Sequence, residues 1–187
     1  MAEHRENQRR ALMAAGRAEL VEHGPEGVRL AAVGTRAGLA RSSVYEYFSS
    51  ASDLITEIAA VAFEDWGAIM TASLADVEPG AAKLHAYVNQ TMRMVAEGRH
   101  EIAGLVGGYR FTAEQSRRFR TLHEDLMRPL RDSLTHMAVP EPDAHALLIQ
   151  GMLDAATRHG ADPSAAARLA ATINNLIDRG LPVPPAT

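Results

Sequence analysis

The sequence predicts an all-α protein, because apolar residues recur at spacings of three and four along nearly the whole chain. No segment shows the alternation of β-branched and polar residues that is typical of strands. Pairs that stop helices, such as Gly24-Pro25 and Pro79-Gly80, separate the periodic segments. The expected helices lie at about 8–23, 30–37, 41–47, from Ser50 to before Pro79, 82–98, 100–106, 112–137, 142–159 and 163–179.

Two of these helices carry local signals of their own. The long helix after Ser50 has a capping signal, in which Ser50 caps the first turn and Asp53, three residues on, reaches back. The segment 112–137 contains Pro129, which should kink or split the helix because proline removes a backbone hydrogen bond and clashes with the preceding turn.

Length and composition indicate a folded protein. A chain of 187 residues makes one large domain or two small ones, and 47% hydrophobic with 22% charged residues is an ordinary globular composition. The absence of cysteine excludes disulfides and thiolate chemistry and favours a reducing cytoplasm. The first ten residues are polar, and no apolar run approaches a membrane span. A cytoplasmic location without membrane association is therefore expected.

The net charge of −4 argues against nucleic acid only until its distribution is considered. Residues 1–55 hold seven arginines and seven acidic residues, whereas residues 56–187 hold twelve basic and sixteen acidic residues. Three arginines, Arg5, Arg9 and Arg10, cluster near the N-terminus. The N-terminal part can therefore present a local basic face.

The segments 30–37 and 41–47 form a predicted helix-turn-helix, with Gly38 in the turn between them. An apolar set locks these helices onto helix 8–23, namely Val33, Ala37, Leu39, Val44 and Phe48. The outward side chains of 41–47 are hydrogen-bond donors and aromatic hydroxyls, namely Arg41, Ser42, Ser43, Tyr45 and Tyr47. A helix of this size fits the major groove of DNA. The two tyrosines have an alternative role as half-buried packing residues.

This stretch resembles the DNA-binding domain of the tetracycline-repressor (TetR) family. The resemblance covers about 47 of the 187 residues and rests on ordered motifs, namely Gly24 after the first helix, Ala37-Gly38-Leu39, Ser43-Val44-Tyr45, Tyr47-Phe48 and Asp53-Leu54. It implies that Ser43 and Tyr45 bind phosphates and that Arg41, Ser42 and Tyr47 approach bases, with Arg41 as the main reader of a guanine edge. We add Arg36, beside the turn, to the predicted DNA-binding set.

The sequence also departs from the family pattern. Ala51 stands where the family commonly has a lysine that neutralises a phosphate, which predicts a shallower salt dependence of DNA binding. Ala40 and Arg29 replace usual Ser or Thr helix caps, and Gly16 and Glu19 stand where Ala and an apolar residue are common. A less rigid DNA-binding unit is therefore expected.

Dimerisation is expected because a small DNA-binding unit binds weakly alone and the family uses its last two helices as a dimer interface. The helices near 142–159 and 163–179 are rich in small and aliphatic residues, namely Leu147, Leu148, Gly151, Met152, Ala155 and Ala156, and Ala166, Leu169, Ile173, Leu176 and Ile177. Packing of these faces within one monomer is the alternative.

Residue type alone indicates the effector-binding site among the helices from 54 to 160. Adaptable apolar and polar side chains suited to a small molecule are Trp66, Met70, Tyr87, Met92, Phe111, Met127 and Gln150. An ordinary core or surface role is the alternative for each of these residues. None of the eight histidines belongs to a metal-ligand motif, so neither a metal nor a cofactor is predicted. The expected organisation is a DNA-binding domain at 1–50, a ligand-binding and dimerisation domain at 51–181 and a disordered tail at 182–187.

Enzyme function is not predicted, because the sequence contains no nucleophile-base set, phosphate loop or metal motif. The favoured function is that of a repressor released from a pseudo-palindromic operator on double-stranded DNA by a small-molecule effector. The alternatives are a helical enzyme or small-molecule-binding module without DNA binding and, among regulators, an activator or a DNA-binding protein without an effector.

Overall fold

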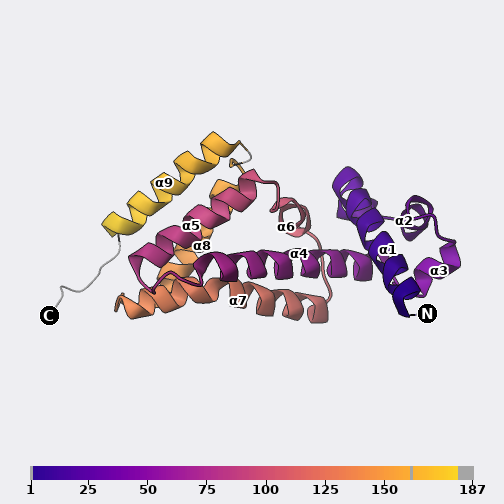
Figure 1. Cartoon of the computed structure of the whole chain (residues 1–187), viewed down its shortest axis with the longest axis horizontal. Coiled ribbons are helices and arrows are strands. Elements are labelled where there is room, and N and C mark those ends of the chain that lie inside the picture. Colours follow the sequence, from indigo (N-terminus) through magenta and orange to yellow (C-terminus); the bar gives the residue numbers. More distant parts are fainter. Residues whose placement is uncertain (1, 161, 181–187) are drawn as a thin grey trace. The chain divides into compact units, whose positions relative to one another are not determined.

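The computed structural model describes residues 2–160 and 162–180, and within these ranges the protein consists of helices without strands (Figure 1). This confirms the predicted all-α fold. The elements are α1 Ala2–His23, a short 3-10 turn Pro25–Gly27, α2 Leu30–Arg36, α3 Arg41–Tyr45, α4 Ala51–Leu74, α5 Ala81–Ala96, α6 Glu101–Val106, α7 Ala113–His136, α8 Pro142–Thr157 and α9 Pro163–Gly180. The predicted tail, 182–187, lies outside the described residues.

The chain forms two compact units. The N-terminal unit comprises the chain up to Glu64 together with 101–120, and the C-terminal unit comprises 65–100 together with the chain from Thr121 on. Both α4 and α7 therefore continue from one unit into the other. The segment 101–120 joins the N-terminal unit because Ile102 and Val106 of α6 are buried in its hydrophobic core. None of the helices described has the length and apolar character needed to cross a bilayer.

A close approach of α1 and α4 organises the N-terminal core. Leu12 and Leu20 of α1 are fully buried, and Gly16 lies between them on the same stripe. A Cβ atom at Gly16 would lie 2.8 Å from Leu54 Cδ2 and 3.0 Å from Ile58 Cδ1 of α4. Glycine therefore lets the two helices pack more closely than alanine would allow.

Side-chain caps define where α4 and α7 begin. The Asp53 backbone N–H donates to the Ser50 hydroxyl at 3.1 Å, as predicted, while the Asp53 carboxylate accepts from the Ser49 hydroxyl. At α7, the Gln115 N–H donates to the Thr112 hydroxyl at 3.2 Å, and the Thr112 N–H donates to the Gln115 side-chain oxygen at 2.9 Å. This second pair is a reciprocal capping box.

Helix α7 continues through Pro129 as one element, so the proline does not split it. Met127, Leu130 and Leu134 are buried on either side of the proline. Their burial holds this segment against the C-terminal core, and that packing offsets the loss of one backbone hydrogen bond.

The C-terminal core forms where α5 packs against α8 and α9. The amphipathic face of α5 buries Leu84, Tyr87 and Val88, and the core also contains Ile173 and Ile177 of α9. Gly160, after α8, is buried, and a Cβ atom there would lie 2.6 Å from Met92 Cε.

Candidate DNA-binding surface and sensor core

Two glycines shape the helix-turn-helix. Gly38 adopts a φ of 68°, a conformation that glycine enters without strain, and the next residue, Leu39, donates its N–H to Gly34 O at 2.9 Å. A Cβ atom at Gly34 would lie 2.7 Å from Val44 Cγ2, so Gly34 admits the buried Val44 of α3 against α2. Sequence reasoning found Gly38 and missed Gly34, because a glycine within a helix carries no turn signal.

The outward face of α3 carries most of the predicted DNA-binding residues. Arg41 and Ser42 are exposed, Ser43 is half-buried, and the Tyr45 side chain is 48% exposed. The Arg41 guanidinium lies 5.7 Å from the Tyr45 ring centroid, within the range of a cation–π contact. Both side chains are exposed, so the contact contributes only about 0.5–1 kcal/mol.

Tyr47 occupies a different position from the α3 residues. It is half-buried, packs against the N-terminal core and donates its hydroxyl hydrogen to Gln8 Oε1 of α1 at 2.8 Å. In this arrangement Tyr47 connects the end of the helix-turn-helix to α1, which matches the packing alternative. A base contact by Tyr47 stays a prediction.

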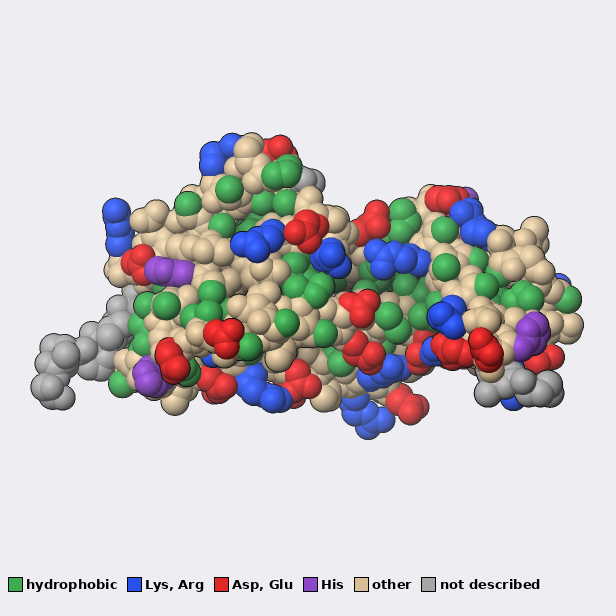
Figure 2. All heavy atoms as spheres, viewed as in Figure 1, with side chains coloured by type: hydrophobic (Ala, Val, Ile, Leu, Met, Phe, Trp, Pro, Cys, Tyr) green, Lys and Arg blue, Asp and Glu red, His purple; other side chains and the backbone are tan. Residues whose placement is uncertain are grey.

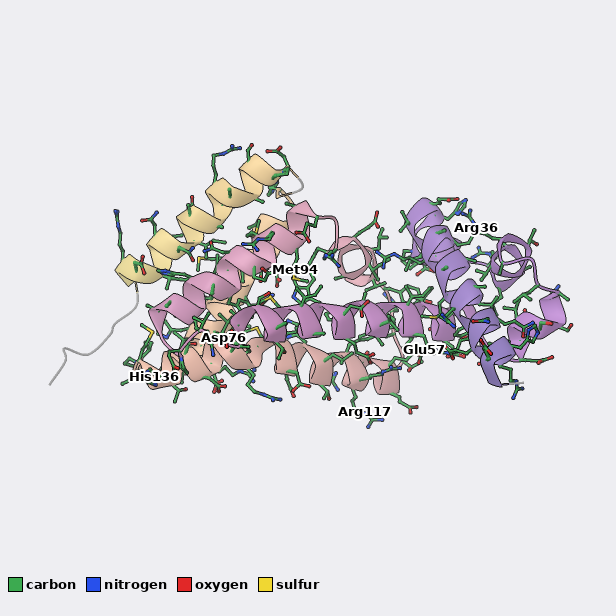
Figure 3. The ribbon with its side chains drawn as sticks, in the orientation of Figure 1. Arg36, Glu57, Asp76, Met94, Arg117 and His136 are labelled. Carbon is green, nitrogen blue, oxygen red and sulfur yellow. The ribbon has the colours of Figure 1, made fainter. Side chains whose placement is uncertain are left out.

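Arg36, labelled in Figure 3, forms ion pairs with two carboxylates of α1. Its Nε donates to Glu19 Oε1 at 2.9 Å, and its terminal nitrogens donate to the two Glu22 oxygens at 2.8 and 2.6 Å. The hydrogen bonds from Arg36 hold the pKa of Glu22 below its usual value. A DNA contact by Arg36 stays a prediction, and it would require the guanidinium to leave Glu22.

The buried position of Glu19 explains one departure from the family pattern. Its side chain is almost fully buried, and a buried carboxylate needs a charged partner. Arg36 supplies that partner, and His23 Nδ1 lies 3.4 Å from the second Glu19 oxygen. Ligand atoms of Glu19, Glu22 and His23 lie within 4.8 Å of one another. Both carboxylates already bond to Arg36, whose single positive charge balances one of their two negative charges.

Six of the seven predicted effector-binding residues lie in the C-terminal unit. Met70, Tyr87, Met92 and Met127 are buried in its core, Trp66 packs against this core, and Gln150 donates to Asp154 Oδ1 at 2.7 Å. Phe111 instead belongs to the N-terminal unit, where its ring centroid lies 5.0 Å from Tyr109 and 4.5 Å from Phe119.

The C-terminal unit also contains polar residues that sequence reasoning missed. The His100 ring meets Trp66 edge to face, with 5.5 Å between ring centroids, and burial lowers the pKa of His100. In the same unit lies Tyr87, which the sequence did predict for the effector site and whose pKa is raised by burial and by the Asp154 charge. The hydroxyl oxygens of Thr91 and Ser133 are buried without a hydrogen-bond partner in the described protein. A single polar residue within an apolar stripe gives no sequence pattern that could reveal it.

Exposed leucines mark the outer face of α8 and α9. Leu147 and Leu148 of α8 are 69% and 66% exposed, and Leu176 of α9 is 55% exposed. On the face drawn in Figure 2, basic and acidic side chains are interspersed with hydrophobic ones.

Residues 12–58 match the family model described as "Bacterial regulatory proteins, tetR family". These residues therefore form a DNA-binding domain of the TetR type. The matched segment runs from α1 into α4 and contains the whole helix-turn-helix, with Gly34, Gly38 and the α3 face. With this domain, the protein is a DNA-binding transcription regulator. A search among curated proteins finds no match.

Solved structures extend the fold similarity over nearly the whole chain. FadR from Bacillus subtilis, in complex with stearoyl-CoA, has a TM-score of 0.77 at 14% identity, covering 91% of this chain and 97% of that one. PfmR from Thermus thermophilus, a TetR family transcriptional regulator, has a TM-score of 0.72 at 20% identity, covering 91% and 98%. At these identities the likeness shows a shared fold.

Proposed function

We propose that this protein is a homodimeric cytoplasmic TetR-family repressor that leaves a pseudo-palindromic operator when a small molecule binds its C-terminal region. The observation that carries the proposal is the exposed α3 face, on which Arg41, Ser42 and Tyr45 project from a base locked by buried Val33 and Val44. DNA binding is assigned to residues 1–50, and sensing and dimerisation to 51–181.

On the DNA side, Arg41 donates two hydrogen bonds to a guanine edge in the major groove. Ser43 and Tyr45 bind phosphates, and Ser42 approaches the bases, where its hydroxyl discriminates weakly. The half-buried position of Ser43 and the exposed Tyr45 side chain support these roles. Tyr47 and Arg36 support this face by their hydrogen bonds to Gln8 and Glu19 of α1.

The dimer forms through the outer faces of α8 and α9. Three leucines exposed on neighbouring helices are unusual for a solvated surface, and a second copy covers them in a two-fold interface. Gly151 supports a close approach there, because a Cβ atom at this position would meet nothing within 4 Å in the monomer. The dimer then presents two copies of α3 to two half-sites.

The effector binds in the methionine-rich core of the C-terminal unit, near Trp66, Tyr87 and Gln150. FadR from Bacillus subtilis binds stearoyl-CoA in a similar fold, which supports an apolar ligand here. The partnerless hydroxyls of Thr91 and Ser133 support a ligand that also carries a polar group. Because α4 continues from one unit into the other, a ligand-favoured arrangement changes the separation of the two α3 helices.

Selection from random DNA duplexes tests the DNA-binding proposal. The full-length protein is expected to enrich a two-fold symmetric site, and a gel shift should show that its own upstream region competes for binding. If no duplex is retained, the protein is a helical ligand-binding module instead. A reporter gene placed behind the selected site then separates repression from activation.

Mass spectrometry of the protein purified under non-denaturing conditions tests for a bound effector. The effector's affinity is then measured with and without the operator. Since linkage is reciprocal, the DNA-bound protein must bind the effector more weakly, by about 1–3 kcal/mol. Equal affinities would contradict ligand release and leave an effector-independent DNA-binding protein.

A further inference from the structure

Glu57 projects from α4 (Figure 3), and its carboxylate pairs with two arginines from distant parts of the chain. Its Oε2 lies 3.1 Å from Arg9 Nη2 of α1, and its Oε1 lies 2.7 Å from Arg118 Nη1 of α7. Arg118 Nη2 also lies 3.6 Å from Oε1 of Glu64, which is further along α4. Glu57 therefore ties α1, α4 and α7 together with one oxygen for each arginine.

Arg9, Glu57 and Arg118 line a polar groove of about 760 Å³ within the N-terminal unit. All three side chains are partly exposed, and the bonds to Glu57 raise the pKa of Arg118, which stays charged. Each exposed pair alone contributes little to stability. The two pairs matter more for position than for stability, because both guanidinium groups bond to the Glu57 carboxylate and together restrain where it lies.

One end of this network leads to the recognition helix α3. Gln8 precedes Arg9 on α1 and accepts the hydrogen bond from the Tyr47 hydroxyl at 2.8 Å. Tyr47 follows α3 by two residues, and its N–H bonds to Val44 O of that helix at 3.0 Å. A shift of α1 at Arg9 therefore changes the support of α3.

The other end of the network, Arg118, is connected through α7 to the C-terminal unit, where the effector is proposed to bind. Arg118 lies three residues before Thr121, where α7 enters the C-terminal unit without a break in the helix. Ser52 of α4 adds a second contact to the start of α7, with its hydroxyl 3.4 Å from Gln115 Oε1. A rotation or translation of α7 therefore acts on Glu57 directly.

We propose that Glu57 is a positioning residue for the recognition helix, through which Arg118 on α7 sets the position of Arg9 and thereby of Tyr47 and α3. Glu57 touches no DNA in this role. Its effect on operator binding rests on the function proposed above, whereas its effect on the order of α3 does not.

Hydrogen exchange of the whole chain, followed by mass spectrometry, tests this coupling from Arg118 through Glu57 to α3 without DNA or effector. We call this coupling the relay. Arg118→Met removes the guanidinium and keeps an apolar stem, and Arg120→Met removes a cation from the same helix as the matched control. Arg118→Met is expected to speed exchange in peptides covering 41–48 by about threefold, and to weaken binding of the selected duplex by a similar factor. Arg120→Met should leave exchange in 41–48 unchanged.

A double-mutant cycle then tests whether Glu57 is the connecting group. Arg9→Met and Arg118→Met should be non-additive in exchange of 41–48, and they should become additive in a Glu57→Gln background. Unchanged exchange in Arg118→Met, or additivity with Glu57 present, would overturn the relay. If Glu57→Gln does not fold, the Arg118→Met result alone decides. If the native protein retains no duplex, the proposed function is contradicted. The relay is then still tested by the exchange experiment, which needs no DNA.

Discussion

The two units bury aliphatic side chains to different extents. In the N-terminal unit the aliphatic residues of the helix-turn-helix, such as Val33 and Val44, are buried, and the exposed face of α3 is polar. In the C-terminal unit Leu147, Leu148 and Leu176 are exposed. The N-terminal unit exposes aliphatic side chains to a smaller extent, 38% at Val21 and at Val61, whereas the C-terminal unit leaves three leucines mostly open to a second apolar surface.

The units also differ in how they treat buried polar groups. Buried Glu19 in the N-terminal unit is paired with Arg36 and lies near His23. In the C-terminal unit the buried hydroxyls of Thr91 and Ser133 have no partner in the described protein. A satisfied ion pair fixes one arrangement, whereas unsatisfied groups leave hydrogen-bonding capacity that a ligand could use.

The largest expected effect concerns the exposed leucines. Replacing Leu147 and Leu148 together by Glu should raise the dimer dissociation constant by about 1000-fold or more, because each buried leucine contributes about 1.5–3 kcal/mol and the dimer has two copies. Sedimentation at a series of concentrations measures this. Val21→Glu, at an aliphatic position on α1 that is 38% exposed, should leave the oligomeric state unchanged. If the native protein is monomeric at every concentration tested, the exposed leucines of the C-terminal unit do not form a dimer interface.

The next effect concerns sequence readout by α3. Arg41→Lys keeps the charge but loses the paired hydrogen bonds, so discrimination at one base position should fall by about 1–3 kcal/mol. Repeating the duplex selection with the variant shows which position relaxes. Arg36→Lys should leave base preference intact, because Glu19 and Glu22 hold the native side chain. Relaxed preference in Arg36→Lys instead would place Arg36 in the readout.

A smaller effect compares one substitution in the two units. Gly16→Ala inserts a methyl group 2.8 Å from Leu54 Cδ2, and the resulting overpacking should exceed the gain in helix propensity, for a net loss of about 1 kcal/mol. Gly67→Ala on α4 meets only Leu126 Cδ2 at 3.6 Å, so it should stabilise by up to about 1 kcal/mol. Urea unfolding measures both. The same sign at the two sites would refute the packing argument.

The smallest effect concerns salt. Ala51, the first residue of α4, packs against the N-terminal core and carries no charge for a phosphate. Ala51→Lys should steepen the log–log dependence of operator affinity on salt by about one unit, because one more counterion is released. Affinities at several salt concentrations give the slope. An unchanged slope would show that position 51 does not reach the DNA backbone.

The helices and the helix-turn-helix could be predicted from the sequence because their signals are local. The spacing of apolar residues, the Gly24-Pro25 break, the Ser50 cap and Gly38 each act within a few residues of where they stand. The expected first helix began at about residue 8, whereas α1 begins at Ala2, since its polar first turns show no apolar stripe.

Contacts between residues distant in sequence were decided only by the tertiary structure. Arg36 meets carboxylates 17 and 14 residues away, Tyr47 meets a residue 39 away, and Glu57 meets arginines 48 and 61 away. No periodicity relates such positions, because their proximity depends on how the helices pack. The sequence also placed Phe111 among the effector-binding residues. In the structure α6 is buried in the N-terminal core, so the segment 101–120, which includes Phe111, belongs to the N-terminal unit.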